Sequence, residues 1–185
     1  LKRKGFSTNY VATIGSGLGG ADKRLLSFTS DLFVAKEIAR TLKEVIQISK
    51  GKVKAHHIYD WAKRNGGQAE KMVKDWIETN KPRRYFSTDG WTKEPTKEEL
   101  GLWFRKPYTV FQMYNNFLWG QKTRYNPVFW NIDERSLERF KRIKESDVGV
   151  LACTVDMTKA KSYHPAEREF RILPEAIISI DKVIR

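Results

Sequence analysis

The chain contains little of what stabilises secreted or membrane-embedded proteins. Its 185 residues include a single cysteine, Cys153, so no disulfide forms within one chain, which fits a reducing cytosol. There is no run of about 18 apolar residues of the kind that spans a membrane. The basic first residues lack the apolar stretch that follows in a signal peptide. We therefore expect a cytoplasmic protein with no membrane partner.

The sequence also shows no metal-ligand pattern, and it has fewer acidic residues than basic ones. The three histidines, His56, His57 and His164, lack ligand spacing with Cys153, so we expect no metal site. Lysine and arginine number 35 against 22 acidic residues, which gives a formal net charge of +13. Such a charge favours polyanionic partners, chiefly nucleic acid. A lysine-rich surface on an ordinary soluble protein gives the same excess.

Local patterns predict strands near both ends of the chain and helices between them. Apolar residues recur at helical spacing from Asp31 to Ser49. Further helices are expected over His56–Asn65, Gln68–Thr79, a segment with Thr96 and Glu99 as a capping box, Tyr108–Leu118 and Ser136–Lys144. Strands are expected over Arg24–Thr29, Glu167–Leu173, Ile177–Ile184 and, as a continuous apolar run typical of a buried strand, Val148–Val155. This order of elements predicts the α+β class.

Two carboxylates near the C-terminus have the spacing of a catalytic pair. If Glu167–Leu173 is a strand, Glu167, Glu169 and Arg171 lie on one face, and Phe170 faces the core. Two acids on one face suit chemistry at a sugar carbon, where one stabilises a developing positive charge and the other handles a proton. A solvated face whose acids pair with neighbouring arginines explains the same spacing.

Three short segments together resemble the mono-ADP-ribosyltransferase superfamily, in its arginine–serine–glutamate class. The segment Leu25–Asp31 is similar to the serine motif, in which an alanine follows eight residues after the first serine, as Ala35 follows Ser27. The segment Glu167–Phe170 resembles the Glu-x-Glu motif, and Arg3 is the best match to the N-terminal arginine motif. The resemblance covers about Leu1–Leu42 and Val148–Arg185.

The chain departs from the family pattern in two motifs. Phe28 replaces the middle threonine of the Ser-Thr-Ser triplet, whereas Thr29 keeps a hydroxyl. Lys2 stands where an aromatic residue usually precedes the arginine, and the glycine comes two residues after Arg3 instead of directly after it. The assignment of Arg3 therefore depends more on motif order than on its neighbours.

The resemblance implies a role for each matching residue, with NAD as co-substrate. Arg3 would hold the pyrophosphate of NAD through a bidentate fork. Ser27 would hydrogen-bond Glu169, and Thr29 would help to shape the nicotinamide pocket. Glu169 would bind the nicotinamide ribose and stabilise the cation left as nicotinamide departs. Glu167 would position or deprotonate the acceptor.

The resemblance also implies an architecture and a loop that contacts the acceptor. The fold would be an ADP-ribosyltransferase-like split β-sandwich, a single domain over 1–185, with a mainly helical target-recognition insertion over 51–145. The stretch Asp156–Pro165 corresponds to the loop that usually touches the acceptor, so Tyr163 and His164 are candidate contacts. A plain surface turn at Pro165 explains the same stretch.

The glycine cluster Gly15–Gly20 matches the dinucleotide fingerprint G-x-G-x-x-G after an apolar segment. That motif requires a long helix directly afterwards, because the pyrophosphate binds at the helix N-terminus. Only Ala21–Leu26 precedes the β-like segment at Ser27, and no further βαβ unit is evident. A flexible glycine loop between strands is therefore the better interpretation.

The middle of the chain is rich in aromatic and basic residues. All 6 tryptophans lie between Gly51 and Glu145, and cations alternate with rings around Arg83 and Arg84. Such mixtures suit stacking on unpaired bases and contact with phosphates, so Arg83 and Arg84 are candidate acceptor contacts. Packing of the rings into the insertion's own core is the alternative.

The leading functional prediction is transfer of ADP-ribose from NAD to a macromolecule, as a toxin or antiviral defence effector. The charge favours an acceptor in RNA or single-stranded nucleic acid, or on a nucleic-acid-associated protein. Transfer to an arginine side chain and simple NAD hydrolysis are alternatives, and an antitoxin or inhibitory subunit is a further partner for such an activity. A non-enzymatic nucleic-acid-binding module, with His56–Thr79 as a helix-turn-helix, is the alternative from another class.

Overall fold

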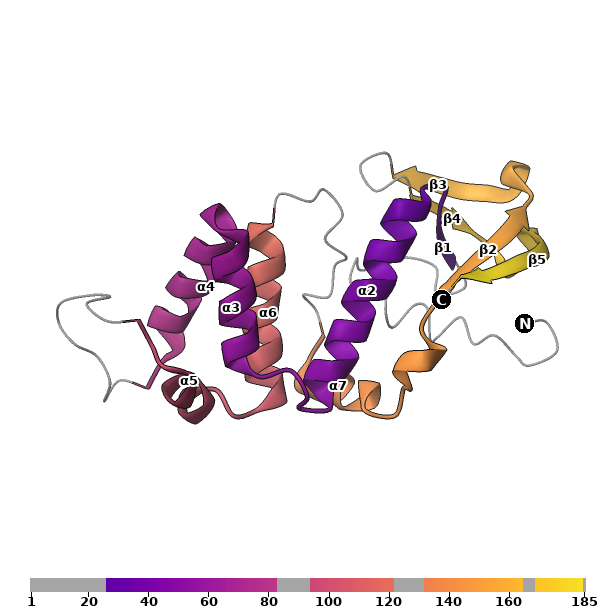
Figure 1. Cartoon of the computed structure of the whole chain (residues 1–185). Helices are drawn as coiled ribbons and strands as arrows, with labels where there is room; N and C mark the ends of the chain where they lie inside the picture. The colour runs from indigo at the N-terminus through magenta and orange to yellow at the C-terminus, as the bar shows by residue number, and fades with distance from the viewer. Residues whose placement is uncertain (1–25, 83–93, 122–131, 165–168, 185) are drawn as a thin grey trace. The chain divides into compact units, whose positions relative to one another are not determined.

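The computed structural model describes residues 26–82, 94–121, 132–164 and 169–184, and for residues 26, 27 and 160–164 it describes the backbone alone (Figure 1). These residues belong to two compact units. The sheet unit comprises described residues up to Leu42 and from Ser146 onward, and the helical unit comprises those from Lys43 to Glu145. Helices and antiparallel strands occupy separate stretches of the chain, so the fold is α+β, as the sequence predicts.

Helix α2, Leu32–Ser49, follows the first described strand directly. Its buried positions include Val34, Val45 and Ile46, which recur at helical spacing and form its core-facing stripe. The chain turns at Gly51, whose φ of 69° is readily adopted only by glycine. The predicted helix is thus confirmed. No helix in the described part of the chain combines the length and apolarity needed to cross a membrane.

The helical unit follows the local patterns closely. Its helices are α3 (Ala55–Asn65), α4 (Gly67–Asn80), α5 (Lys97–Trp103), α6 (Pro107–Gly120) and α7 (Glu134–Phe140). The predicted capping box begins α5: the Glu99 backbone N–H donates to Thr96 Oγ1 at 3.1 Å, and the Thr96 N–H donates to Glu99 Oε2 at 2.7 Å. Helix α7 ends at Phe140, earlier than the predicted Lys144.

Helices α4 and α6 pack against each other at very close range. The approach is tightest at Gly120, the last residue of α6, where an added Cβ would lie 2.2 Å from the Cα of Ala69. Only the absence of a side chain permits this contact. Gly120 is therefore a packing requirement of the helical unit.

The sheet unit contains two small antiparallel sheets. The first has the strand order β1–β4–β3, with β1 at Leu26–Thr29, β4 at Glu169–Ile172 and β3 at Ala160–His164. The second pairs β2 (Val150–Val155) with β5 (Ile177–Ile184). The core of the unit is built from both sheets, since Ile172 and Ala176 are fully buried and contact Phe28, Val155, Phe170 and Ile177.

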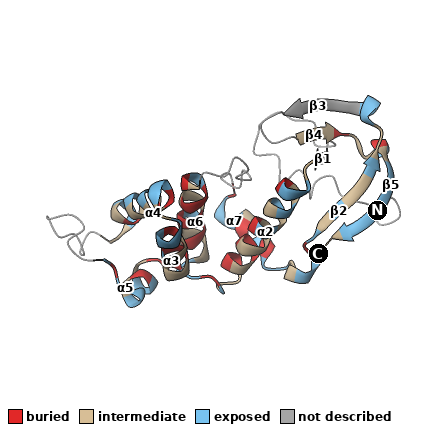
Figure 2. Ribbon diagram, turned by 45° about the horizontal axis from the view of Figure 1, so that its top comes forward, coloured by how far each residue is buried: buried red, intermediate tan, exposed pale blue. Residues whose placement is uncertain are grey.

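Strand β2 differs from the sequence prediction. The apolar run Val148–Val155 predicts a buried strand, but β2 is half-buried to exposed, and the side chain of Leu151 is 39% exposed. Figure 2 shows that most of its partner β5 is exposed as well. The reason is topological: among the described strands, β2 pairs only with β5, so this run is half of a two-stranded ribbon and not the centre of a sheet.

We predict that Gly120→Ala destabilises the helical unit, because the new Cβ collides with backbone atoms of α4 that have no rotamer to change. The expected loss in the free energy of unfolding is about 1–3 kcal/mol. Urea unfolding followed by circular dichroism measures it. The matched control is Gly101→Ala in α5, where a Cβ meets no described atom within 4 Å. Helix propensity should make that variant about 0.5–1 kcal/mol more stable. Equal stability of the two variants would contradict the close approach.

Candidate active site

The serine motif and the Glu-x-Glu motif lie on neighbouring strands. In the antiparallel register of β1 and β4, Thr29 is opposite Glu169 and Ser27 is opposite Arg171. Directly opposed residues in such a ladder have Cβ atoms about 4.5–5.5 Å apart. The tertiary structure thus brings together two motifs that are separated by most of the chain. Of Ser27 the structure describes the backbone only, so its side chain lies outside the described residues.

The turn after β1 is organised by two short side chains. The Thr29 hydroxyl oxygen accepts a hydrogen bond from the Asp31 backbone N–H at 3.1 Å. Asp31 Oδ1 in turn accepts from the N–H groups of Phe33 at 2.8 Å and Val34 at 3.4 Å, which caps α2. The strand ends at Thr29 and the helix begins three residues later, at Leu32, and this fixes the backbone beside Glu169.

Glu169 forms an ion pair with Arg171 on the same face of β4. Arg171 Nε lies 3.5 Å from Glu169 Oε1, and their side chains are 21% and 14% exposed. Side chains two residues apart on a strand point the same way, so Glu169 and Arg171 share a face as predicted, whereas Glu167 lies outside the described residues. The pairing of acid with arginine is also what an ordinary structural strand face would show. The carboxylate is thus largely enclosed beside the guanidinium.

The opposite face of the same strands is apolar. Phe28 and Phe170 are opposite each other in the register of β1 and β4, and both contact the core around the fully buried Ile172. The alternation of polar and apolar residues along β4 therefore matches the pleat of the strand. Because a one-residue slip would exchange the two faces, burial of this cluster fixes which residues face Thr29 and Glu169.

The segment before the Glu-x-Glu motif is a strand, not the predicted loop. After a short 3-10 turn at Met157–Lys159, residues Ala160–His164 form β3, and Tyr163 and His164 lie opposite Phe170 and Glu169. The prediction of a loop over Asp156–Pro165 is wrong for Ala160–His164, because these residues pair with β4. Pro165 lies outside the described residues. The alternation of Ser162 and His164 with Tyr163 is the signal that would have indicated a strand.

Asp156 stabilises the turn that leads into β3. Its Oδ1 accepts hydrogen bonds from the Thr158 hydroxyl at 2.6 Å and the Thr158 N–H at 3.0 Å. These bonds, the hydroxyl foremost, lower the pKa of Asp156 because they stabilise the ionised carboxylate. The turn delivers β3 to the free edge of β4, on the side away from β1.

Four predicted site residues, Arg3, Glu167, Arg83 and Arg84, lie outside the described residues. The pyrophosphate contact, the second carboxylate and the two basic acceptor contacts therefore stay predictions. Within the described part of the chain, no three side chains of His, Cys, Asp or Glu are grouped as a metal site requires.

Most described aromatic rings of the helical unit pack against one another. The ring centroids of Trp61 and Tyr114 are 6.2 Å apart, and those of Trp76 and Phe104 are 5.0 Å apart. These distances are typical of rings in a core. Trp119, by contrast, is 55% exposed. The aromatic content of this region thus serves mainly its own packing, among the rings that the structure describes.

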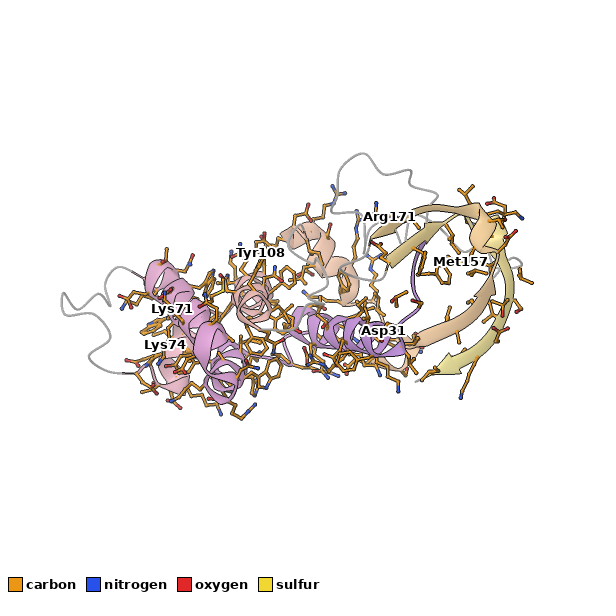
Figure 3. All side chains as sticks on the ribbon, turned by 90° about the horizontal axis from the view of Figure 1, so that it is seen from above. Asp31, Lys71, Lys74, Tyr108, Met157 and Arg171 are labelled. Atoms are coloured by element: carbon orange, nitrogen blue, oxygen red, sulfur yellow. The ribbon has the colours of Figure 1, made fainter. Side chains whose placement is uncertain are left out.

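Helices α3 and α4 lack two features of a DNA-binding helix-turn-helix. Gly66 alone separates them, whereas that motif has a turn of three or four residues. The lysines of α4 are also engaged within the unit: Lys71 pairs with Asp75 at 2.5 Å and Lys74 with Glu70 at 2.7 Å (Figure 3). A recognition helix would present such cations to phosphates.

Comparison of the chain with protein-family models, with curated proteins and with solved structures finds no match. The chemistry of the site is therefore inferred from its own residues. Those residues are a carboxylate, a guanidinium and a hydroxyl on one face of two paired strands.

We predict that Asp31→Ala lowers the free energy of unfolding by about 1 kcal/mol, because two N–H groups of α2 lose their acceptor. Thermal unfolding monitored by circular dichroism measures the change. Asp31→Asn is the matched control and should stay within a few tenths of a kcal/mol of the parent protein, since asparagine caps helices equally well. A parent-like Asp31→Ala protein would show that this cap does not stabilise the strand–helix junction.

Proposed function

We propose that this chain transfers ADP-ribose from NAD to a macromolecular acceptor. The observation that carries the proposal is the register of β1 and β4, in which the hydroxyl-bearing motif lies beside Glu169. Any catalytic use of the two motifs requires that they meet, although they lie at opposite ends of the chain. The proposed architecture is the ADP-ribosyltransferase-like split β-sandwich, and a core shared by both small sheets supports it.

In the proposed reaction, the bond between the ribose carbon C1′ and the nicotinamide nitrogen breaks, and the electron pair leaves with nicotinamide. The Glu169 carboxylate binds a hydroxyl of that ribose and stabilises the positive charge that develops on it. A nucleophilic atom of the acceptor then bonds to C1′, and its proton passes to Glu167. Electrostatic stabilisation of the transition state requires Glu169 to be ionised and accessible to the ribose.

Thr29 and Ser27 line the same strand junction in this proposal. The Thr29 hydroxyl accepts from Asp31, and within the described residues no acceptor for its own proton is found, so it retains a donor for a ligand. Ser27, opposite Arg171, would orient Glu169. Arg3 would complete the site at the pyrophosphate. His164 and Tyr163, on the strand beside Glu169, would be contacts for the acceptor.

The net charge of +13 supports a nucleic-acid acceptor, in RNA or single-stranded form. An arginine or other side chain of a nucleic-acid-associated protein is the second candidate, and water as acceptor would make the chain an NAD hydrolase. An activity of this kind in the cytoplasm suits a toxin or defence effector, with an antitoxin as partner. Labelling a lysate with NAD that carries an isotope in its adenosine half, then digesting with nuclease or protease, separates these acceptors.

We predict that Glu169→Gln slows nicotinamide release from NAD at least about 100-fold, because the neutral amide no longer stabilises the developing charge. The control is Glu175→Gln, a change of the same type at an exposed position of the same unit, which should leave the rate unchanged. Release is measured by chromatography at saturating NAD. An unchanged rate in Glu169→Gln removes the enzymatic proposal and leaves the chain as a nucleic-acid-binding module.

We predict that reversing the charge at Arg83 and Arg84 together weakens binding to single-stranded RNA. The slope of log affinity against log salt should fall by about 1.4, because about two phosphate contacts are lost at about 0.7 each. Fluorescence anisotropy over a salt series measures both quantities. Lys141→Glu is the control, because Lys141 already pairs with Glu138 at 2.6 Å. Binding by the parent protein without salt dependence would point to a protein acceptor instead.

A further inference from the structure

The guanidinium of Arg171, beside Glu169, has hydrogen-bonding capacity that no described residue uses. The only interaction of the Arg171 side chain with a described residue is the ion pair to Glu169, at 3.5 Å, which is longer than the 2.7–3.2 Å of an N–H···O hydrogen bond. A guanidinium has five N–H donors and keeps its charge at any ordinary pH. Within the described part of the chain, none of these donors has a hydrogen-bond acceptor, although the side chain is only 21% exposed.

Arg40 in α2 shows how an arginine of the same unit behaves when its role is structural. Its Nε and Nη2 both donate to Glu37 Oε2, at 3.3 and 2.9 Å, and its side chain is 46% exposed. The side chain of Arg171 is less exposed than that of Arg40, and it makes fewer hydrogen bonds to described residues. A largely enclosed cation without hydrogen-bond acceptors is costly unless a ligand supplies them.

The order of charges on this face matches a dinucleotide. The strand presents a carboxylate at Glu169 and a guanidinium two residues further along, at Arg171. Figure 3 labels Arg171. NAD has a positively charged nicotinamide ring on one ribose and an anionic pyrophosphate beyond that ribose. A guanidinium also matches a phosphate group in geometry, because its planar fork can donate two parallel hydrogen bonds.

We infer that Arg171 binds a phosphate of the dinucleotide through its terminal amino groups while its Nε side holds Glu169. This inference rests on the proposed function, because it assigns the substrate's anionic part to the same strand face. It adds Arg171 to the site as a binding residue, in a role that the sequence motifs give to Arg3 alone. The guanidinium would also separate the substrate's phosphates from the Glu169 carboxylate, which otherwise repel each other.

The experiment measures the binding of ADP-ribose and, separately, of nicotinamide by calorimetry. Arg171→Gln should weaken ADP-ribose binding about 10- to 100-fold, the effect of losing a charge-assisted hydrogen bond. Nicotinamide binding should stay within about twofold, since nicotinamide carries no phosphate. Arg171→Lys keeps the charge without the fork and should fall between the parent and Arg171→Gln. The matched control Arg40→Gln should bind both ligands as the parent does.

Two outcomes overturn the inference. One is a parent-like ADP-ribose affinity in Arg171→Gln, even where nicotinamide release has slowed, because Arg171 would then act only on Glu169. The other is a parent protein that does not bind ADP-ribose. Thermal unfolding verifies that each variant is folded. If Arg171→Gln is not folded, the ADP-ribose affinity of Arg171→Lys tests the inference instead. A parent protein that binds ADP-ribose through Arg171 but releases no nicotinamide would refute the proposed transfer and support the phosphate site.

Discussion

The antiparallel pairing of β1 with β4 is the constraint on which the proposed site depends. Four residue pairs join the first described strand to one near the C-terminus, from Leu26 opposite Ile172 to Thr29 opposite Glu169. The pairing is held in register by burial on one face, where Phe28 and Phe170 pack against Ile172. Since a slip by one residue would expose these rings, the apolar face determines the polar one.

The polar face of β1 and β4 carries an ion pair between Glu169 and Arg171. Pairing Glu169 with Arg171 stabilises two charges that are each largely enclosed, which an ordinary strand face would also do. What distinguishes this pair is that the guanidinium has no hydrogen-bond acceptor among the described residues, whereas Arg40 in the same unit uses two nitrogens on Glu37. The difference is expected if the face completes its hydrogen bonding only when a ligand is present.

The helical unit contains the stretch of the sequence that is rich in aromatic and basic residues. Trp61, Trp76 and Trp103 contact other rings. Lys71 and Lys74 on α4 pair with acids one turn away, so these rings and cations have partners within the unit. Composition is a statement about the whole chain, whereas a binding surface needs side chains that local partners leave unused.

The sequence by itself determined the helices, the capping box at Thr96 and the alternation along Glu169–Ile172, because these depend on residues within a turn or two of one another. Only the tertiary structure decided that β1 lies beside β4, that Ala160–His164 is a strand rather than a loop, and that Val150–Val155 is part of an exposed ribbon. Strand pairing joins residues far apart in the chain. Periodicity does not predict which strand a given strand pairs with. That pairing determines which side chains are buried and which functional groups lie together.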